Sequence, residues 1–92
     1  MTFEITASDY SLLNRLTDTP GLPGREKLVV DVIKDALPEQ NWDVHTDPLG
    51  NLMAHRPGSG KKLLFIAHTD EVGLIVRRIT PQGFLQVERL GG

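Results

Sequence analysis

The sequence predicts an α/β fold, in which helices in the first half precede strands that include one buried in a sheet. Three observations support this prediction: a helical repeat of apolar residues over 25–37, Pro- and Gly-rich turns in the second half, and an unbroken apolar run over 63–67. A run of this length indicates a strand covered on both faces, as in parallel sheets flanked by helices. We therefore expect helices plus a mixed sheet.

The composition of the 92-residue chain limits the class of protein. Its 39% hydrophobic content is ordinary for a globular protein, and its net charge of −2 gives no basic surface for nucleic acid or an anionic membrane. The absence of cysteine excludes disulfides, thiolate metal sites and cysteine nucleophiles. No segment approaches the roughly 18 apolar residues of a transmembrane helix. Because the N-terminal residues also lack the pattern of a secretion signal, we expect a cytoplasmic protein.

Two helices are predicted in the first half. Residues 8–16 form a short amphipathic helix, for which Ser8 or Asp9 is the expected cap. A loop with two prolines and two glycines follows and excludes regular structure. A longer helix over 25–37 has apolar residues at helical spacing opposite charged ones, and Pro38 ends it.

The second half contains two predicted hairpins, one on each side of the apolar run. The first pairs residues 42–46 with 51–55 around Asp47-Pro48-Leu49-Gly50, which has the composition of a tight turn. The second pairs residues 72–79 with 84–90 around a turn with Pro at its second position and Gly at its fourth. The whole order is therefore helix, helix, hairpin, buried strand, hairpin.

The apolar run ends at His68, and Asp70 follows two residues later. Ligands of open α/β sheets bind beyond the carboxyl ends of the strands, and a neutral imidazole is the commonest metal ligand in proteins. Residues two apart in an extended chain point to the same side, so we expect Asp70 near His68, where a carboxylate fixes the tautomer of a ligand. The alternative is a histidine that merely ends a strand, and the residues alone leave both possibilities open.

Other candidate sites in the sequence are weaker. His45 and His55 lie among polar residues of the first predicted hairpin, so we expect both to be solvated. The stretch Gly58-Ser59-Gly60-Lys61 is not a phosphate-binding loop, because that motif needs a glycine where His55 stands and a Ser or Thr where Lys62 stands.

Taken together, these motifs resemble the N-terminal part of the tetrahedral (TET-type) metalloaminopeptidases, which include glutamyl and deblocking aminopeptidases. The resemblance rests on the Pro-Gly loop before the second helix, on Leu49-Gly50-Asn51, and on Ala67-His68-Thr69-Asp70-Glu71-Val72-Gly73. It runs from about Leu12 to the last residue. The chain departs from the family at Thr69, where methionine is frequent, and at Pro23, where serine is common.

The resemblance implies the fold and chemistry of a two-metal exopeptidase. Residues 1–71 would belong to its α/β catalytic domain, and residues 72–92 would form the first hairpin of a β-rich inserted domain. His68 would bind one of two divalent metal ions, zinc or cobalt, and Asp70 would support that ligand during catalysis. Two adjacent ions activate a water and polarise the scissile carbonyl of a peptide substrate. The full-length family also implies a homo-oligomer.

The same resemblance implies that this chain carries only one corner of an active site. Family members are several times longer, and their general base and remaining metal ligands lie outside this segment. Because a catalytic metal needs about three protein ligands, we expect the isolated chain to be an inactive N-terminal fragment of an aminopeptidase. One alternative is a non-catalytic interaction module that pairs with a full-length enzyme. Another is a related two-metal exopeptidase family.

Overall fold

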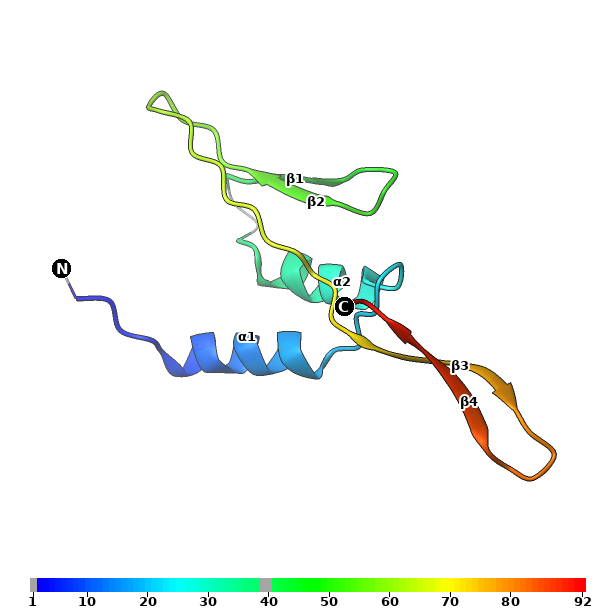
Figure 1. Cartoon of the computed structure of the whole chain (residues 1–92). Helices are drawn as coiled ribbons and strands as arrows, with labels where there is room; N and C mark the ends of the chain where they lie inside the picture. The colour runs from blue at the N-terminus through cyan, green and yellow to red at the C-terminus, as the bar shows by residue number, and fades with distance from the viewer. Residues whose placement is uncertain (1, 39–40) are drawn as a thin grey trace.

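The computed structural model describes residues 2–38 and 41–92 of the chain, as two helices followed by two hairpins (Figure 1). The elements are, in order, α1 (Ala7–Asp18), α2 (Lys27–Ala36), β1 (Asp43–Thr46), β2 (Leu52–His55), β3 (Gly73–Ile79) and β4 (Leu85–Leu90). Each hairpin is a two-stranded antiparallel sheet, β1 with β2 and β3 with β4. Both predicted helices and both predicted hairpins are confirmed, with ends that differ by a few residues.

The first helix begins at a cap that lies earlier than the sequence indicated. Thr6 is the N-cap of α1, and its hydroxyl accepts a hydrogen bond from the Asp9 backbone N–H at 3.3 Å. The Asp9 carboxylate accepts one from the Thr6 backbone N–H at 2.8 Å, which lowers the pKa of that carboxyl. The predicted cap at Ser8 or Asp9 is therefore wrong, because Asp9 acts as the third residue of a capping box that starts at Thr6.

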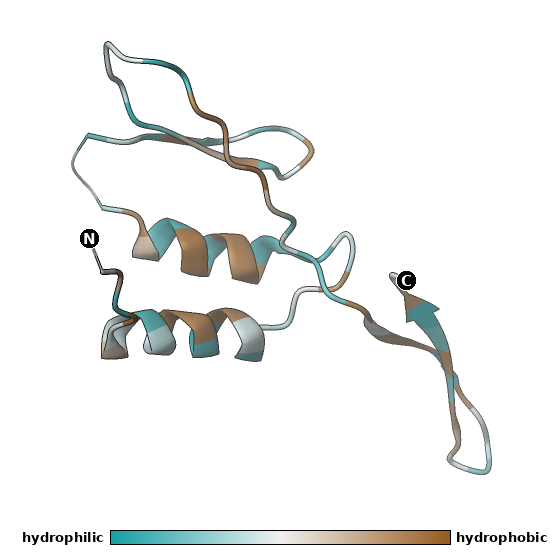
Figure 2. Ribbon diagram, turned by 60° about the vertical axis from the view of Figure 1, so that its left-hand side comes forward, coloured by the Kyte–Doolittle hydropathy of each residue, from teal (hydrophilic) through white to brown (hydrophobic). Residues whose placement is uncertain are grey.

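The second helix supplies the buried core. Val29 and Val30 of α2 are 6% and 5% exposed, and they are the buried apolar side chains of the described residues. α1 lies beside α2 in both views of the chain (Figures 1 and 2). An exposed ion pair of 3.9 Å joins Arg15 of α1 to Asp35 of α2, and pairs of this kind contribute little to stability. The buried core of the described residues thus consists of these two valines.

The turn between β1 and β2 is held by two backbone hydrogen bonds, from Asp47 N–H to Asn51 O and from Gly50 N–H to Asp47 O, each at 3.0 Å, and by one carboxylate. Asp47 Oδ1 accepts hydrogen bonds from the backbone N–H groups of Leu49 and Asn51, each at 2.9 Å. Asp47 Oδ2 accepts another from the Asn51 side-chain amide at 2.8 Å. Gly50 adopts a φ of 89°, a conformation that glycine reaches without steric cost. The predicted tight turn is confirmed, and Asp47 is the reason for it.

This network makes the first hairpin sensitive to acid. The hydrogen bond from the Asn51 side chain is the largest cause that holds the pKa of Asp47 below its usual value of 3.8, and the hydrogen bond from the Asn51 backbone N–H is the next largest. A carboxyl with a lowered folded-state pKa contributes stability above its unfolded pKa, and this contribution is lost as pH falls through the folded value. We expect the Asn51 backbone amide signal in an NMR titration to move toward its unfolded position below pH 3.8.

A matched pair of variants separates the turn from general acid effects. Asp47→Ala should give the unfolded Asn51 amide position already at neutral pH, because the acceptor is absent. Asp43→Ala, at the far end of β1, should leave the wild-type titration unchanged. An Asn51 amide that stays at its native position in strong acid would contradict the assigned role of Asp47.

The second hairpin presents an apolar face to solvent. In its register Val76 lies opposite Val87 and Ile79 opposite Leu85, with an irregularity at Arg77. All four of these aliphatic side chains are exposed. On the hairpin, Arg77 forms an ion pair of 2.5 Å with Glu88 across the strands. A two-stranded ribbon with an uncovered apolar face is marginally stable by itself.

The predicted buried strand over 63–67 is wrong. Residues 63–67 run as an extended segment without strand pairing, and the side chains of residues 63–66 are between 82% and 89% exposed. The predicted mixed sheet is likewise wrong for residues 2–38 and 41–92, whose two sheets are antiparallel pairs. The physical reason is that a strand needs a neighbour to accept its backbone hydrogen bonds, and none of the described residues pairs with this segment.

The overall shape is extended rather than compact. The radius of gyration is 17.8 Å, whereas a compact domain of this length has about 12 Å. Figure 2 shows apolar residues along the helices and along the segment that connects the two hairpins. In the described part of the chain, no helix combines the length and the apolarity needed to cross a membrane.

Candidate metal centre

The candidate site lies on the extended segment between the two hairpins. This segment passes α2 and the β1–β2 hairpin before it enters β3 (Figure 1). A hollow of about 640 Å³ is lined by α2, by the β1–β2 turn and by residues 64–70 of the segment. His68 and Asp70 are part of this lining, together with the carboxyl-bearing residues Glu26 and Asp47.

The structure brings His68 and Asp70 together, as their spacing predicted. The Nδ1 atom of His68 lies 3.0 Å from the backbone oxygen of Asp70 and 3.1 Å from its Oδ1. A backbone carbonyl and a carboxylate oxygen only accept hydrogen bonds, so Nδ1 must carry the proton. The lone pair of the ring is therefore on Nε2, which is the atom left to bind a metal. Since the His68 side chain is 84% exposed, an ion can approach it.

This arrangement fits one ligand position of a metal centre. The Asp70 oxygens select the ring tautomer and orient the imidazole, which is how carboxylates support metal-bound histidines. The described ranges 2–38 and 41–92 contain no group of three or more His, Cys, Asp or Glu residues placed to hold a metal ion. His68 thus offers one nitrogen, with Asp70 behind it. The roles of these two residues stay predictions.

The other histidines do not join this pair. His45 in β1 and His55 in β2 are both exposed, which agrees with the expectation that they are solvated. In the antiparallel register His45 lies opposite Met53, and His55 lies opposite Asp43.

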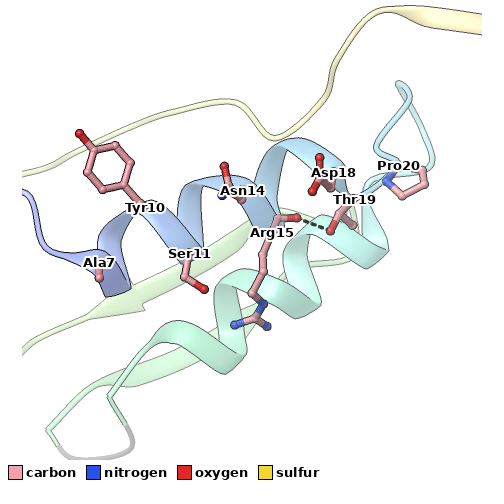
Figure 3. Close-up of a pocket in the computed structure, with 8 residues that line it drawn as sticks. All are labelled: Ala7, Tyr10, Ser11, Asn14, Arg15, Asp18, Thr19 and Pro20. Carbon is pink, nitrogen blue, oxygen red and sulfur yellow. Dashed lines mark hydrogen bonds between the residues drawn. The ribbon is translucent and has the colours of Figure 1, made fainter.

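A separate hollow runs along α1. Figure 3 shows its side chains, with the Thr19 hydroxyl donating a hydrogen bond of 2.5 Å to the backbone oxygen of Arg15. Tyr10 and Asn14 line the same surface. Because neither His68 nor Asp70 reaches it, this surface is distinct from the candidate metal centre.

Comparison with known proteins decides the family. Residues 50–92 match the model of the M42 glutamyl aminopeptidase family, and this range includes His68 and Asp70. The lysyl aminopeptidase of Pyrococcus furiosus is 39% identical over 91% of this chain and 25% of its own length. The chain belongs to the M42 peptidase family. The resemblance to aminopeptidases stated from the sequence is confirmed.

Further relatives extend the similarity to proteins named as aminopeptidases over the whole chain. SgcX of Escherichia coli is 41% identical over all of this chain and 24% of its own length, and its name assigns it provisionally to the aminopeptidases. A similarly named protein of Acetivibrio thermocellus is 36% identical over 90% of the chain and 25% of its own length. The chain spans about a quarter of the length of the curated relatives it matches.

The sequence did not indicate that the loop before α2 contacts the chain next to Asp70. The Pro-Gly loop before α2 was interpreted as a break between helices and as one feature of the family resemblance, without a contact assigned to it, yet Gly21 O accepts a hydrogen bond of 2.8 Å from Glu71 N–H. The loop therefore contacts the backbone directly after Asp70. The available signal was the pair of glycines in the loop, because glycine permits close approach of backbone to backbone.

Proposed function

We propose that this chain is part of a metal-dependent aminopeptidase, in which His68 binds one of two divalent metal ions, zinc or cobalt, through Nε2. The observation that carries the proposal is the position of His68 Nδ1 between two acceptor oxygens of Asp70. Membership of the M42 family and relatives named as aminopeptidases support the reaction class. Peptides are the proposed substrates, and the complete enzyme is proposed to be a homo-oligomer.

Within this proposal each residue has a separate task. Asp70 accepts a hydrogen bond from Nδ1–H and keeps the ring oriented, and His68 Nε2 occupies one coordination position. When bound, the pair of ions activates a water and polarises the scissile carbonyl. Residues 1–71 are proposed to form part of the catalytic domain, and residues 72–92 the first hairpin of an inserted domain.

We also propose that the isolated chain is inactive. A catalytic divalent ion takes about three protein ligands, and the described residues hold no cluster of that size. The ligands beyond His68 would come from parts of an M42 enzyme outside this chain.

A metal titration of the 92-residue chain tests the ligand assignment. Because cobalt is paramagnetic, we expect addition of Co²⁺ to broaden the NMR ring signals of His68 before those of His45 and His55. Uptake should be weak, since one imidazole supplies one bond. In the His68→Ala variant this first response should be absent, whereas His45→Ala should retain it.

Two outcomes would contradict the proposal. A first response at His45 or His55 would remove the ligand assignment from His68. Tight stoichiometric metal binding, or hydrolysis of an aminoacyl chromogenic substrate by the isolated chain, would contradict the inactive state.

A second candidate function is a non-catalytic interaction module. It is favoured by the exposed apolar face of the β3–β4 hairpin and by the unpaired segment over 63–66, since unpaired strands are templates for pairing with another chain. Association with a full-length M42 enzyme distinguishes this candidate from the fragment.

A further inference from the structure

We propose that the Pro-Gly loop over residues 20–24, through Gly21, positions the His68–Asp70 pair. The inference rests on the proposed function only in treating this pair as part of the metal centre. Its structural content, that the loop sets the geometry of the His68 ring, is independent of any bound metal.

Gly21 lies in a closely packed place beside α2. Gly21 is buried, and its backbone oxygen accepts the 2.8 Å hydrogen bond from Glu71 N–H. A Cβ atom added at Gly21 would lie 2.7 Å from Val29 Cγ2 and 3.3 Å from the backbone oxygen of Thr69. Gly21 therefore fills the space between the buried core of α2 and the backbone that joins His68 to Asp70.

The same loop also lies close to residues that follow Asp70. A Cβ atom added at Gly73 would overlap the Leu22 side chain. One at Gly91 would lie 3.1 Å from Val72 Cγ1 and 3.6 Å from Pro23 Cγ. Consecutive residues of the loop thus contact the chain on the C-terminal side of the His68–Asp70 pair.

The loop is connected to the His68 imidazole through Asp70 and the backbone beside it. The hydrogen bonds of the His68 side chain, among the described residues, go to the backbone and side-chain oxygens of Asp70. With the ring 84% exposed, its orientation depends on where the backbone over 68–70 places those two oxygens. Gly21 O holds this backbone directly after Asp70 through the hydrogen bond from Glu71 N–H. Directly before Asp70, the missing side chain of Gly21 leaves room for Thr69 O, which a Cβ atom would approach to 3.3 Å. The loop is a positioning element, and His68 is the residue on which it acts.

The test uses Gly21→Ala in the full 92-residue chain. The added methyl group cannot remain 2.7 Å from Val29 Cγ2, so the loop must move, and Glu71 must move with it or lose its bond. We expect loss of the Nδ1–H tautomer of His68, measured by the ¹⁵N chemical shifts of the ring without metal. Gly58→Ala is the matched control, because a Cβ atom there meets open space, and it should keep the tautomer.

A second pair of variants separates positioning from stability. Val29→Ala removes the methyl groups that the new side chain would meet, so Gly21→Ala/Val29→Ala should regain the Nδ1–H tautomer. Val29→Ala alone should unfold more easily, as followed by circular dichroism, while keeping the tautomer. Loss of the tautomer in Val29→Ala, no recovery in the double variant, or a wild-type chain without the Nδ1–H form would each overturn the proposal.

Addition of Co²⁺ to the same samples distinguishes failure of the positioning role from failure of the proposed metal role. If wild-type His68 shows the tautomer pattern above but no response to Co²⁺, the metal role fails and the positioning role stands. If His68 responds to Co²⁺ in the wild type, and its tautomer and Co²⁺ response are both unchanged in Gly21→Ala, the positioning role is overturned and the metal role stands.

Discussion

Replacing His68 with alanine in a full-length M42 aminopeptidase that contains this segment is expected to abolish one metal site and reduce kcat/KM to background. The reason is that, in the proposed site, the ring supplies Nε2 as a ligand, and alanine supplies nothing in its place. Asp70→Asn is expected to have a smaller effect, about 10- to 100-fold in metal affinity or activity, because the carboxylate acts on the metal only through the imidazole. His68→Ala should therefore lower metal content and kcat/KM more than Asp70→Asn does.

The measurement pairs kinetics with metal content. Hydrolysis of an aminoacyl chromogenic substrate gives kcat/KM, and elemental analysis gives the ions bound per chain. His55→Ala is the matched control, because His55 is exposed in β2, outside the hollow that His68 lines, and it should leave both quantities unchanged. Full activity and full metal content in His68→Ala would show that the His68–Asp70 contact serves only local structure.

The elements that could be predicted from sequence are those whose causes are local. The α2 helix follows from an apolar repeat that ends before Pro38, and the first hairpin follows from a turn in which Asp47 bonds residues two and four positions later. The contact of His68 with Asp70 is local as well, since the two are separated by one residue. In each case the interacting groups lie within a few positions of one another.

The failures have a common physical cause. The segment over 63–67 has the composition of a buried strand, but burial and pairing depend on other chain segments, and the described residues do not provide them. The contact between Gly21 and Glu71 joins positions that are distant in sequence, so no periodicity or spacing could indicate it. The N-cap of α1 was predicted at Ser8 or Asp9 instead of Thr6, because threonine and serine are both good capping residues and lie close together here.

The exposed segment over 63–66 is also expected to cause self-association. We expect the wild-type chain to self-associate at concentrations on the order of micromolar to millimolar, because residues 63–66 present four apolar side chains and unpaired backbone groups. Leu63 and Phe65 are two apart in an extended segment and so lie on one side of it. Burying each such side chain contributes about 1.5–3 kcal/mol.

Leu63→Lys/Phe65→Lys should therefore weaken association by at least about 3 kcal/mol, which is roughly 100-fold in the dissociation constant. Sedimentation velocity over a concentration series measures this shift. Leu49→Lys is the matched control, because Leu49 is an equally exposed leucine but lies outside the unpaired segment, in the β1–β2 turn. A wild-type chain that stays monomeric throughout the series would contradict the role assigned to the segment.

Adding a full-length M42 enzyme to the same experiment decides between the two candidate functions. An interaction module should form a defined complex with the enzyme, and Leu63→Lys/Phe65→Lys should dissociate it while Leu49→Lys should not. A fragment whose apolar segment has no specific partner should instead form heterogeneous assemblies whether or not the enzyme is present. The difference arises because pairing with one complementary strand edge satisfies both the backbone groups and the apolar side chains of residues 63–66, whereas non-specific collapse buries only the side chains.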